Sequence, residues 1–118
     1  MNLFGLCGAL SAFIAVGAGA FGAHGLRNTL TPELLHTFET GARYQMYHAL
    51  GLALIAVLPK TSLTTSAGWM FLAGTVLFSG SLYALCLSGV TWLGAITPLG
   101  GLCFLAGWAT LAVQFARR

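Results

Sequence analysis

The sequence predicts an all-α integral membrane protein, a bundle of four transmembrane helices whose long second helix runs from amphipathic to apolar. Hydrophobic residues make up 58% of the chain and charged residues only 6%, whereas soluble domains carry about 25% charged residues. Five basic and two acidic side chains cannot solvate the surface of a 12.3 kDa protein, so most of that surface must face lipid. Four apolar segments follow one another in a single transmembrane domain over residues 1–118, with spans at about 3–23, 38–58, 67–87 and 93–115.

The first span has no charged residue between Leu3 and Ala23. No basic residue precedes it, which disfavours a secretory signal peptide. Its small residues recur every three or four positions, which predicts a seam where another helix packs closely: Gly5, Gly8, Ala12, Ala15, Gly19 and Gly22. The bulky residues on the other side predict the lipid face: Leu3, Leu6, Leu10, Phe13, Ile14 and Phe21.

The second helix is expected to begin with Thr31 as its N-cap and Pro32 at its first position, and to end before Pro59. Such a helix is roughly 40 Å long at 1.5 Å per residue. Only Ala49 to Leu58 is purely apolar, which is too short to cross a hydrocarbon core about 30 Å thick. Its polar first half therefore enters the membrane or lies along the surface.

Only Ser88 to Trp92 separates the third and fourth spans, which predicts a tight antiparallel hairpin. Pro98 is expected to kink the early part of the fourth span. Two further small or polar faces predict packing surfaces, namely Gly74, Ser81, Ala84 and Ser88 in the third span, and Gly100, Cys103, Gly107, Thr110 and Gln114 in the fourth. The three cysteines lie in apolar segments without metal-ligand spacing.

The net charge of +3 does not indicate nucleic-acid binding, because the basic residues are scattered instead of forming a stripe. Four spans place Lys60, Arg117 and Arg118 on one side of the membrane, and Arg27 and Arg43 toward the other. The positive-inside rule then favours cytoplasmic termini.

One face of the second helix is polar. At 100° per residue the members of this face lie within about 80° of one another: His36, Glu39, Thr40, Arg43 and Tyr47. Glu39 and Arg43 are spaced i,i+4 with the acid first, the favoured order for an ion pair. Because a charge in the membrane costs at least about 2.5 kcal/mol, we expect Arg43 to be buried and paired with Glu39, on a face directed into the bundle.

We therefore predict a polar cluster between the first two helices. Its members are His24, Glu39, Arg43, Tyr44, Tyr47 and His48. The cluster could staple the two helices together, or bind an amphiphile such as a lipid headgroup or a quinone. Ion or proton transport is less favoured because the chain has only two acids, and axial haem ligation by two of the three histidines finds no level pair. No catalytic constellation is present, so we expect no enzyme, no cofactor and no metal.

Two stretches carry a resemblance to a known family: Gly19-Ala20-Phe21-Gly22-Ala23-His24-Gly25-Leu26 and Arg43-Tyr44-Gln45-Met46-Tyr47-His48-Ala49-Leu50-Gly51. Phe78-Ser79-Gly80-Ser81 and Ile96-Thr97-Pro98-Leu99-Gly100-Gly101 also fit. The chain resembles the small bacterial inner-membrane proteins grouped as domain of unknown function 423, to which the animal mitochondrial transmembrane protein 256 is similar. The resemblance implies a four-helix inner-membrane protein and a polar signature of His24, Arg43, Tyr44, Gln45, Tyr47 and His48. It implies no activity.

The function expected from these observations is that of a non-enzymatic accessory or lipid-associated protein of the bacterial inner membrane, with both termini in the cytoplasm. Membrane lipids are its expected partners, with a homo-oligomer or a larger membrane complex left open. The alternative is an oligomeric transporter or channel for small solutes or ions.

Overall fold

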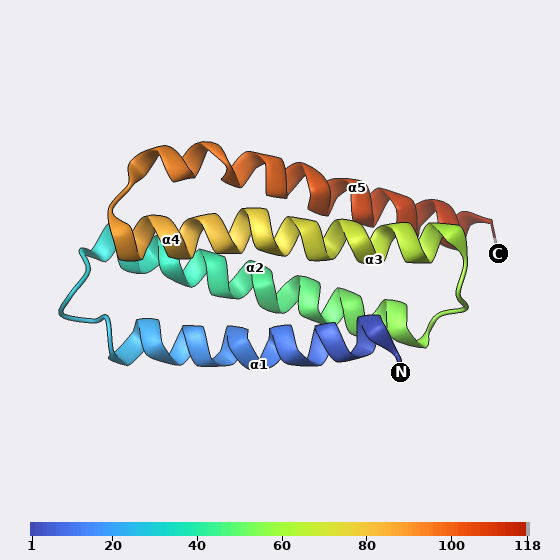
Figure 1. Cartoon of the computed structure of the whole chain (residues 1–118), viewed down its shortest axis with the longest axis horizontal. Helices are drawn as coiled ribbons and strands as arrows, with labels where there is room; N and C mark the ends of the chain where they lie inside the picture. Colours follow the sequence, from blue (N-terminus) through green and yellow to red (C-terminus); the bar gives the residue numbers. More distant parts are fainter. Residues whose placement is uncertain (118) are drawn as a thin grey trace.

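The computed structural model describes residues 1–117, which form four helical rods in up-and-down order. The prediction of an all-α fold is confirmed. The helices are α1 (Leu3–His24), α2 (Pro32–Val57), α3 (Ser62–Gly74), the π-helical turn η1 (Thr75–Ser79), α4 (Gly80–Ser88), the 3₁₀ turn η2 (Thr91–Ala95) and α5 (Thr97–Ala116). In Figure 1, α3, η1 and α4 form one continuous rod, and both chain ends lie at the same end of the molecule.

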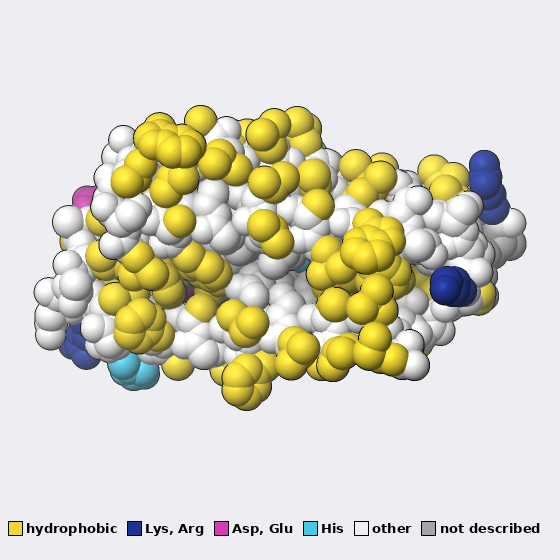
Figure 2. Space-filling model, viewed as in Figure 1, with side chains coloured by type: hydrophobic (Ala, Val, Ile, Leu, Met, Phe, Trp, Pro, Cys, Tyr) yellow, Lys and Arg dark blue, Asp and Glu magenta, His cyan; other side chains and the backbone are white. Residues whose placement is uncertain are grey.

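Three of the rods are long and apolar enough to cross a membrane: Leu3–His24, Ser62–Ser88 and Thr91–Ala116. The remaining rod, α2, does not meet that criterion, because its first half carries the polar residues. The molecule measures 49 × 26 × 20 Å, longer than a hydrocarbon core of about 30 Å. On the face in Figure 2, hydrophobic side chains cover the middle, and Lys and Arg side chains lie only near the two ends.

The predicted seam of α1 packs against the antiparallel helix α2. Asn2 caps α1 by accepting from the Gly5 N–H, and its Nδ2 donates to the Ala56 carbonyl at 2.9 Å. A Cβ added at Gly8 would lie 2.8 Å from the Ala49 carbonyl oxygen, so the two backbones approach closely. The six residues of the predicted lipid face are all exposed, as expected.

Gly19 departs from this seam. A Cβ added there would meet no atom within 4 Å, although a Cβ at Gly22, one turn later, would lie 2.8 Å from the Phe38 ring. The two helices therefore leave open space beside Gly19, and the prediction that this residue is a packing contact is wrong.

Local sequence signals set the ends of α2 and α3. Thr31 caps α2, with its hydroxyl accepting from the Leu34 N–H at 3.2 Å, and Pro32 occupies the first turn as predicted. The third rod begins at Ser62, five residues before the predicted start at 67, because Thr61 and Thr64 form a reciprocal capping box.

The π-helical turn η1 changes which residues of the third rod face inward. A π turn accommodates one extra residue and so rotates the following segment relative to a regular α-helix. Beyond it, Ser79, Leu82 and Cys86 are buried, whereas Ala84 and Ser88 are exposed. The predicted face is therefore wrong for its last two members.

The last rod packs on the third through Gly100 and Gly107, as predicted. A Cβ at Gly107 would lie 2.6 Å from the Phe71 ring, and one at Gly100 would clash with the backbone of Phe78. Gly89 has φ +74° and ends α4, a conformation that glycine adopts without the steric cost of a side chain. Pro98 does not kink a continuous helix: it lies in the first turn of α5, after the separate turn η2.

Candidate functional site

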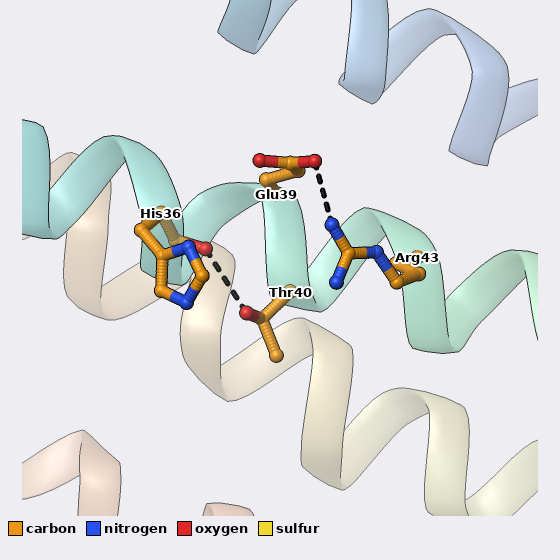
Figure 3. Close-up of polar contacts among 4 residues, drawn as sticks. All are labelled: His36, Glu39, Thr40 and Arg43. Carbon is orange, nitrogen blue, oxygen red and sulfur yellow. Dashed lines mark hydrogen bonds and ion pairs between the residues drawn. The ribbon is translucent and has the colours of Figure 1, made fainter.

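The polar face of α2 lies on the outside of the bundle. Arg43 Nη2 and Glu39 Oε1 form the predicted ion pair at 2.7 Å, but the side chains of Arg43 and Glu39 are 45% and 60% exposed. The prediction that Arg43 is buried in the bundle is therefore wrong. Figure 3 shows the pair on one flank of α2, with Thr40 donating to the His36 carbonyl at 3.0 Å.

The opposite face of α2 explains this orientation. It presents small and apolar residues to its neighbours and is buried along the helix: Phe38, Gly41, Ala42, Gln45, His48, Ala49, Gly51, Leu52 and Ile55. A Cβ at Gly41 would lie 3.0 Å from the Tyr83 ring and one at Gly51 would lie 2.8 Å from the Phe71 ring. Close packing of this face against the third rod turns the charged face outward.

Gln45 is the buried polar side chain that joins three helices. Its Nε2 donates to the carbonyl and the hydroxyl of Ser11 on α1, both at 3.2 Å. Its Oε1 accepts from the Tyr83 hydroxyl on α4 at 2.7 Å. Near it, the Ser79 hydroxyl donates to the Gly41 carbonyl at 2.6 Å. Gln45, and not the Glu39–Arg43 pair, therefore staples α1 to α2.

His48 lies in the aromatic interior between α2 and α5. Its ring stacks on Phe104 at a centroid distance of 3.5 Å and an interplanar angle of 2°. Trp108 Nε1 donates to His48 Nε2 at 3.0 Å, and His48 Nδ1 lies 2.7 Å from the Tyr44 carbonyl oxygen. Both ring nitrogens are thus used within the bundle, so His48 does not belong to the exposed face.

The other members of the predicted cluster lie on the surface. Tyr44 and Tyr47 are both partly exposed, with their rings 5.4 Å apart, and neither hydroxyl has a hydrogen-bond partner among residues 1–117. His24 is exposed at the end of α1. The structure therefore brings Glu39, Arg43, Tyr44 and Tyr47 onto one outer face, and separates His48 from them.

A groove of about 560 Å³ runs between the end of α1 and the start of α2. Its lining residues are Gly19, Gly22, Ala23, Pro32, Leu35, His36, Phe38 and Glu39. The glycines and Ala23 leave the space open, Leu35 and Phe38 make it apolar, and His36 and Glu39 add polar atoms. Arg43 follows Glu39 by one helical turn. This arrangement can accommodate an apolar chain beside a charged group.

Three buried partners were not identified from the sequence as site residues: Ser11, Tyr83 and Trp108. Gln45 was marked only through the resemblance, although an amide in the middle of a helix packed among apolar neighbours is itself a signal of interhelical bonding. The partners give no comparable signal, because their relevance depends on which helices meet. Within residues 1–117, no three His, Cys, Asp or Glu side chains gather to hold a metal ion.

Comparison with known proteins places the chain in a family. Residues 18–101, which include the exposed charged face and the groove, match the family described as "Protein of unknown function (DUF423)". The chain belongs to this family.

Related members of the DUF423 family cover nearly the whole chain. The UPF0382 membrane protein YwdK of Bacillus subtilis (strain 168) is 48% identical over 117 residues, which is 96% of this chain and 95% of YwdK. The UPF0382 membrane protein SH2409 of Staphylococcus haemolyticus (strain JCSC1435) is 50% identical over 116 residues, covering 97% and 95% of the two chains. No solved structure matches. This DUF423 protein is therefore a membrane protein, surrounded by lipid, whose activity is not given by its relatives.

Proposed function

We propose that this DUF423 protein is a non-enzymatic, four-span protein of the bacterial inner membrane that binds a membrane lipid in the groove between α1 and α2. The observation that carries the proposal is the open space beside Gly19, which adjoins a charged face on the outside of the bundle. An apolar cavity with a few polar groups at one side is the usual form of a small-molecule site.

The packing of α2 supports its being the fourth span. α2 is in contact with α1 from Asn2 and Ala56 at one end to Gly22 and Phe38 at the other. It therefore lies alongside a helix apolar enough to cross the membrane, instead of on the membrane surface. In this arrangement the Gln45–Ser11 contact lies near the middle of α1, and Arg43 is only about 3 Å further along the helix axis.

The exposed pair then lies within the depth of the membrane. A charged side chain there costs at least about 2.5 kcal/mol unless it finds a polar partner. The Arg43 and Glu39 side chains lean toward the N-terminus of α2, and long charged side chains reach for the polar boundary in this way. A lipid held at the groove supplies polar atoms to the pair and apolar chains to the surface beside it.

The transport alternative has less support. A permeation path needs polar groups left open to water, and the described buried side-chain nitrogen and oxygen atoms all have hydrogen-bond partners. A second cavity of about 530 Å³ is lined by residues that include Asn2, Ala56 and Thr64. It therefore lies at the opposite end of α1 and α2 from the Gly19 groove. Two separate end cavities fit an accessory protein with a closed interior.

We propose a membrane orientation with both termini in the cytoplasm. Four crossings place Lys60 and Arg117 on the same side as the chain ends, with Arg27 on the other side, and the more basic side faces the cytoplasm. A C-terminal reporter that fluoresces only in the cytoplasm is expected to be active. Activity of an alkaline phosphatase fused at the same point, which requires export, would reverse the orientation.

The lipid site is tested by filling the groove. Gly19→Leu places a side chain in open space, so the bundle is expected to fold while lipid is excluded. Gly17→Leu is the matched control: a Cβ there also meets no atom within 4 Å, but Gly17 does not line the groove. Native mass spectrometry of protein extracted with its own lipids should show bound lipid on the parent and on Gly17→Leu, and little on Gly19→Leu. Equal lipid on both variants would contradict the proposal.

A further inference from the structure

The ion pair on the outer face of α2 is only partly satisfied. One hydrogen bond, from Arg43 Nη2 to Glu39 Oε1, joins the two side chains. Among the described residues, Glu39 Oε2 and Arg43 Nε and Nη1 form no hydrogen bond. A carboxylate oxygen and two guanidinium nitrogens are thus left to bind an outside group. Since guanidinium recognises phosphate through two parallel hydrogen bonds, the open atoms can bind an anion and a cation at once.

The order of groups along α2 follows the order of groups in a phospholipid. Starting from the end of α2 near the groove, the exposed residues are Glu39, Arg43, Tyr47, Leu50, Leu54 and Val57. Their spacing of three or four positions makes one continuous stripe on the helix. The stripe is charged at one end, has a free phenolic hydroxyl next, and is apolar beyond.

We propose that the lipid bound by this DUF423 protein carries a zwitterionic headgroup with a primary ammonium and a phosphate, the phosphoethanolamine class. This inference rests on the proposed function, because it names the headgroup of the same ligand. The ammonium, outermost in the lipid, donates to Glu39 Oε2. The phosphate accepts from Arg43, and the acyl chains lie on the apolar part of the stripe and in the groove.

Other headgroups complete the pair less well. A trimethylammonium group has no N–H and cannot donate to Glu39. A glycerol headgroup carries the phosphate but no cation, so Glu39 keeps an unpaired charge beside a second anion. One hydrogen bond to a charged group contributes roughly a tenfold difference in affinity, so we expect about tenfold preference for phosphatidylethanolamine over phosphatidylcholine and phosphatidylglycerol.

The test uses nanodiscs with equal amounts of phosphatidylethanolamine, phosphatidylcholine and phosphatidylglycerol, and native mass spectrometry to count the lipids retained by the full chain. The exchange of Glu39→Arg with Arg43→Glu is the informative variant. It keeps an i,i+4 ion pair on the same face but reverses the order of the charges along the membrane normal. The parent is expected to retain phosphatidylethanolamine, and the exchanged variant to lose that preference while its melting temperature stays near that of the parent.

A second variant covers the case in which the exchange does not fold. Glu39→Gln removes the acceptor for the ammonium but leaves Arg43, so it is expected to abolish the preference for phosphatidylethanolamine and to favour phosphatidylglycerol. An unchanged preference in either variant overturns the headgroup assignment. Equal retention of all three lipids by the parent also overturns it; if Gly19→Leu still releases lipid, the proposed function stands without it. If the parent retains no lipid, both proposals fail.

Discussion

Trp108 Nε1 donates a hydrogen bond to His48 Nε2 at 3.0 Å, and this contact decides which imidazole nitrogen carries the proton. An indole N–H can only donate, so Nε2 is the acceptor. Nδ1 then carries the hydrogen in the neutral ring and donates to the Tyr44 carbonyl at 2.7 Å. Because both nitrogens are occupied, a metal or haem iron would have to displace Trp108 or the helix carbonyl.

This contact predicts the effect of Trp108→Phe. The change keeps an aromatic ring but leaves the buried His48 Nε2 without a donor, which costs about 1–3 kcal/mol. Thermal unfolding in detergent should show a lower melting temperature. Trp69→Phe is the control, because Trp69 is 54% exposed and its indole nitrogen has no hydrogen-bond partner among the described residues. Equal melting temperatures for both variants would show that the Trp108–His48 bond contributes nothing measurable.

The seam between α1 and α2 predicts opposite effects at two glycines of one helix. Gly8→Leu drives a side chain into the Ala49 carbonyl, which a Cβ would already approach to 2.8 Å. Such overpacking typically costs about 1–3 kcal/mol. Gly17→Leu, in open space, should leave the unfolding transition in place. If Gly8→Leu melts like Gly17→Leu, the two helices are not held by this close approach.

The bond between the Tyr83 hydroxyl and Gln45 predicts measurable coupling between α4 and α2. We expect Tyr83→Phe and Gln45→Leu each to lower the free energy of unfolding, and the double variant to lose less than the sum. The coupling energy should be about 0.5–1.5 kcal/mol, the range found for hydrogen bonds between membrane helices. Unfolding in mixed micelles, measured for all four proteins, provides the cycle. Strictly additive effects would mean that the two residues act independently.

The exposure of the Glu39–Arg43 pair predicts small stability effects. Glu39→Gln and Arg43→Gln should each change the free energy of unfolding by about 1 kcal/mol or less, as for other exposed pairs. Lipid retention should change instead, because Arg43→Gln removes the guanidinium expected to bind phosphate. A loss of several kcal/mol in detergent would place the pair in a buried environment and would contradict the exposed arrangement.

Local sequence patterns predicted much of the fold, because the interactions behind them are local. Thr31 and Pro32 start α2 through bonds to neighbours within one turn. Gly8 and Gly107 lie in helix contacts as their spacing predicted, since only small residues permit such close approach in lipid. The start of α3 was missed because Thr64 replaces the usual Glu or Gln in the capping box. The π turn η1 was missed because no residue type marks it.

For the candidate site, the sequence alone determined that a polar face exists on the second helix and that Glu39 and Arg43 are paired on it, because i,i+4 spacing brings two side chains together on any α-helix. Only the tertiary structure decided that this face points outward while Gln45 and His48 point inward. The direction depends on how Gly41, Gly51 and Phe38 fit the neighbouring rods. That fit is a sum of contacts between distant segments, and a helical pattern specifies which residues share a face but not what the face contacts.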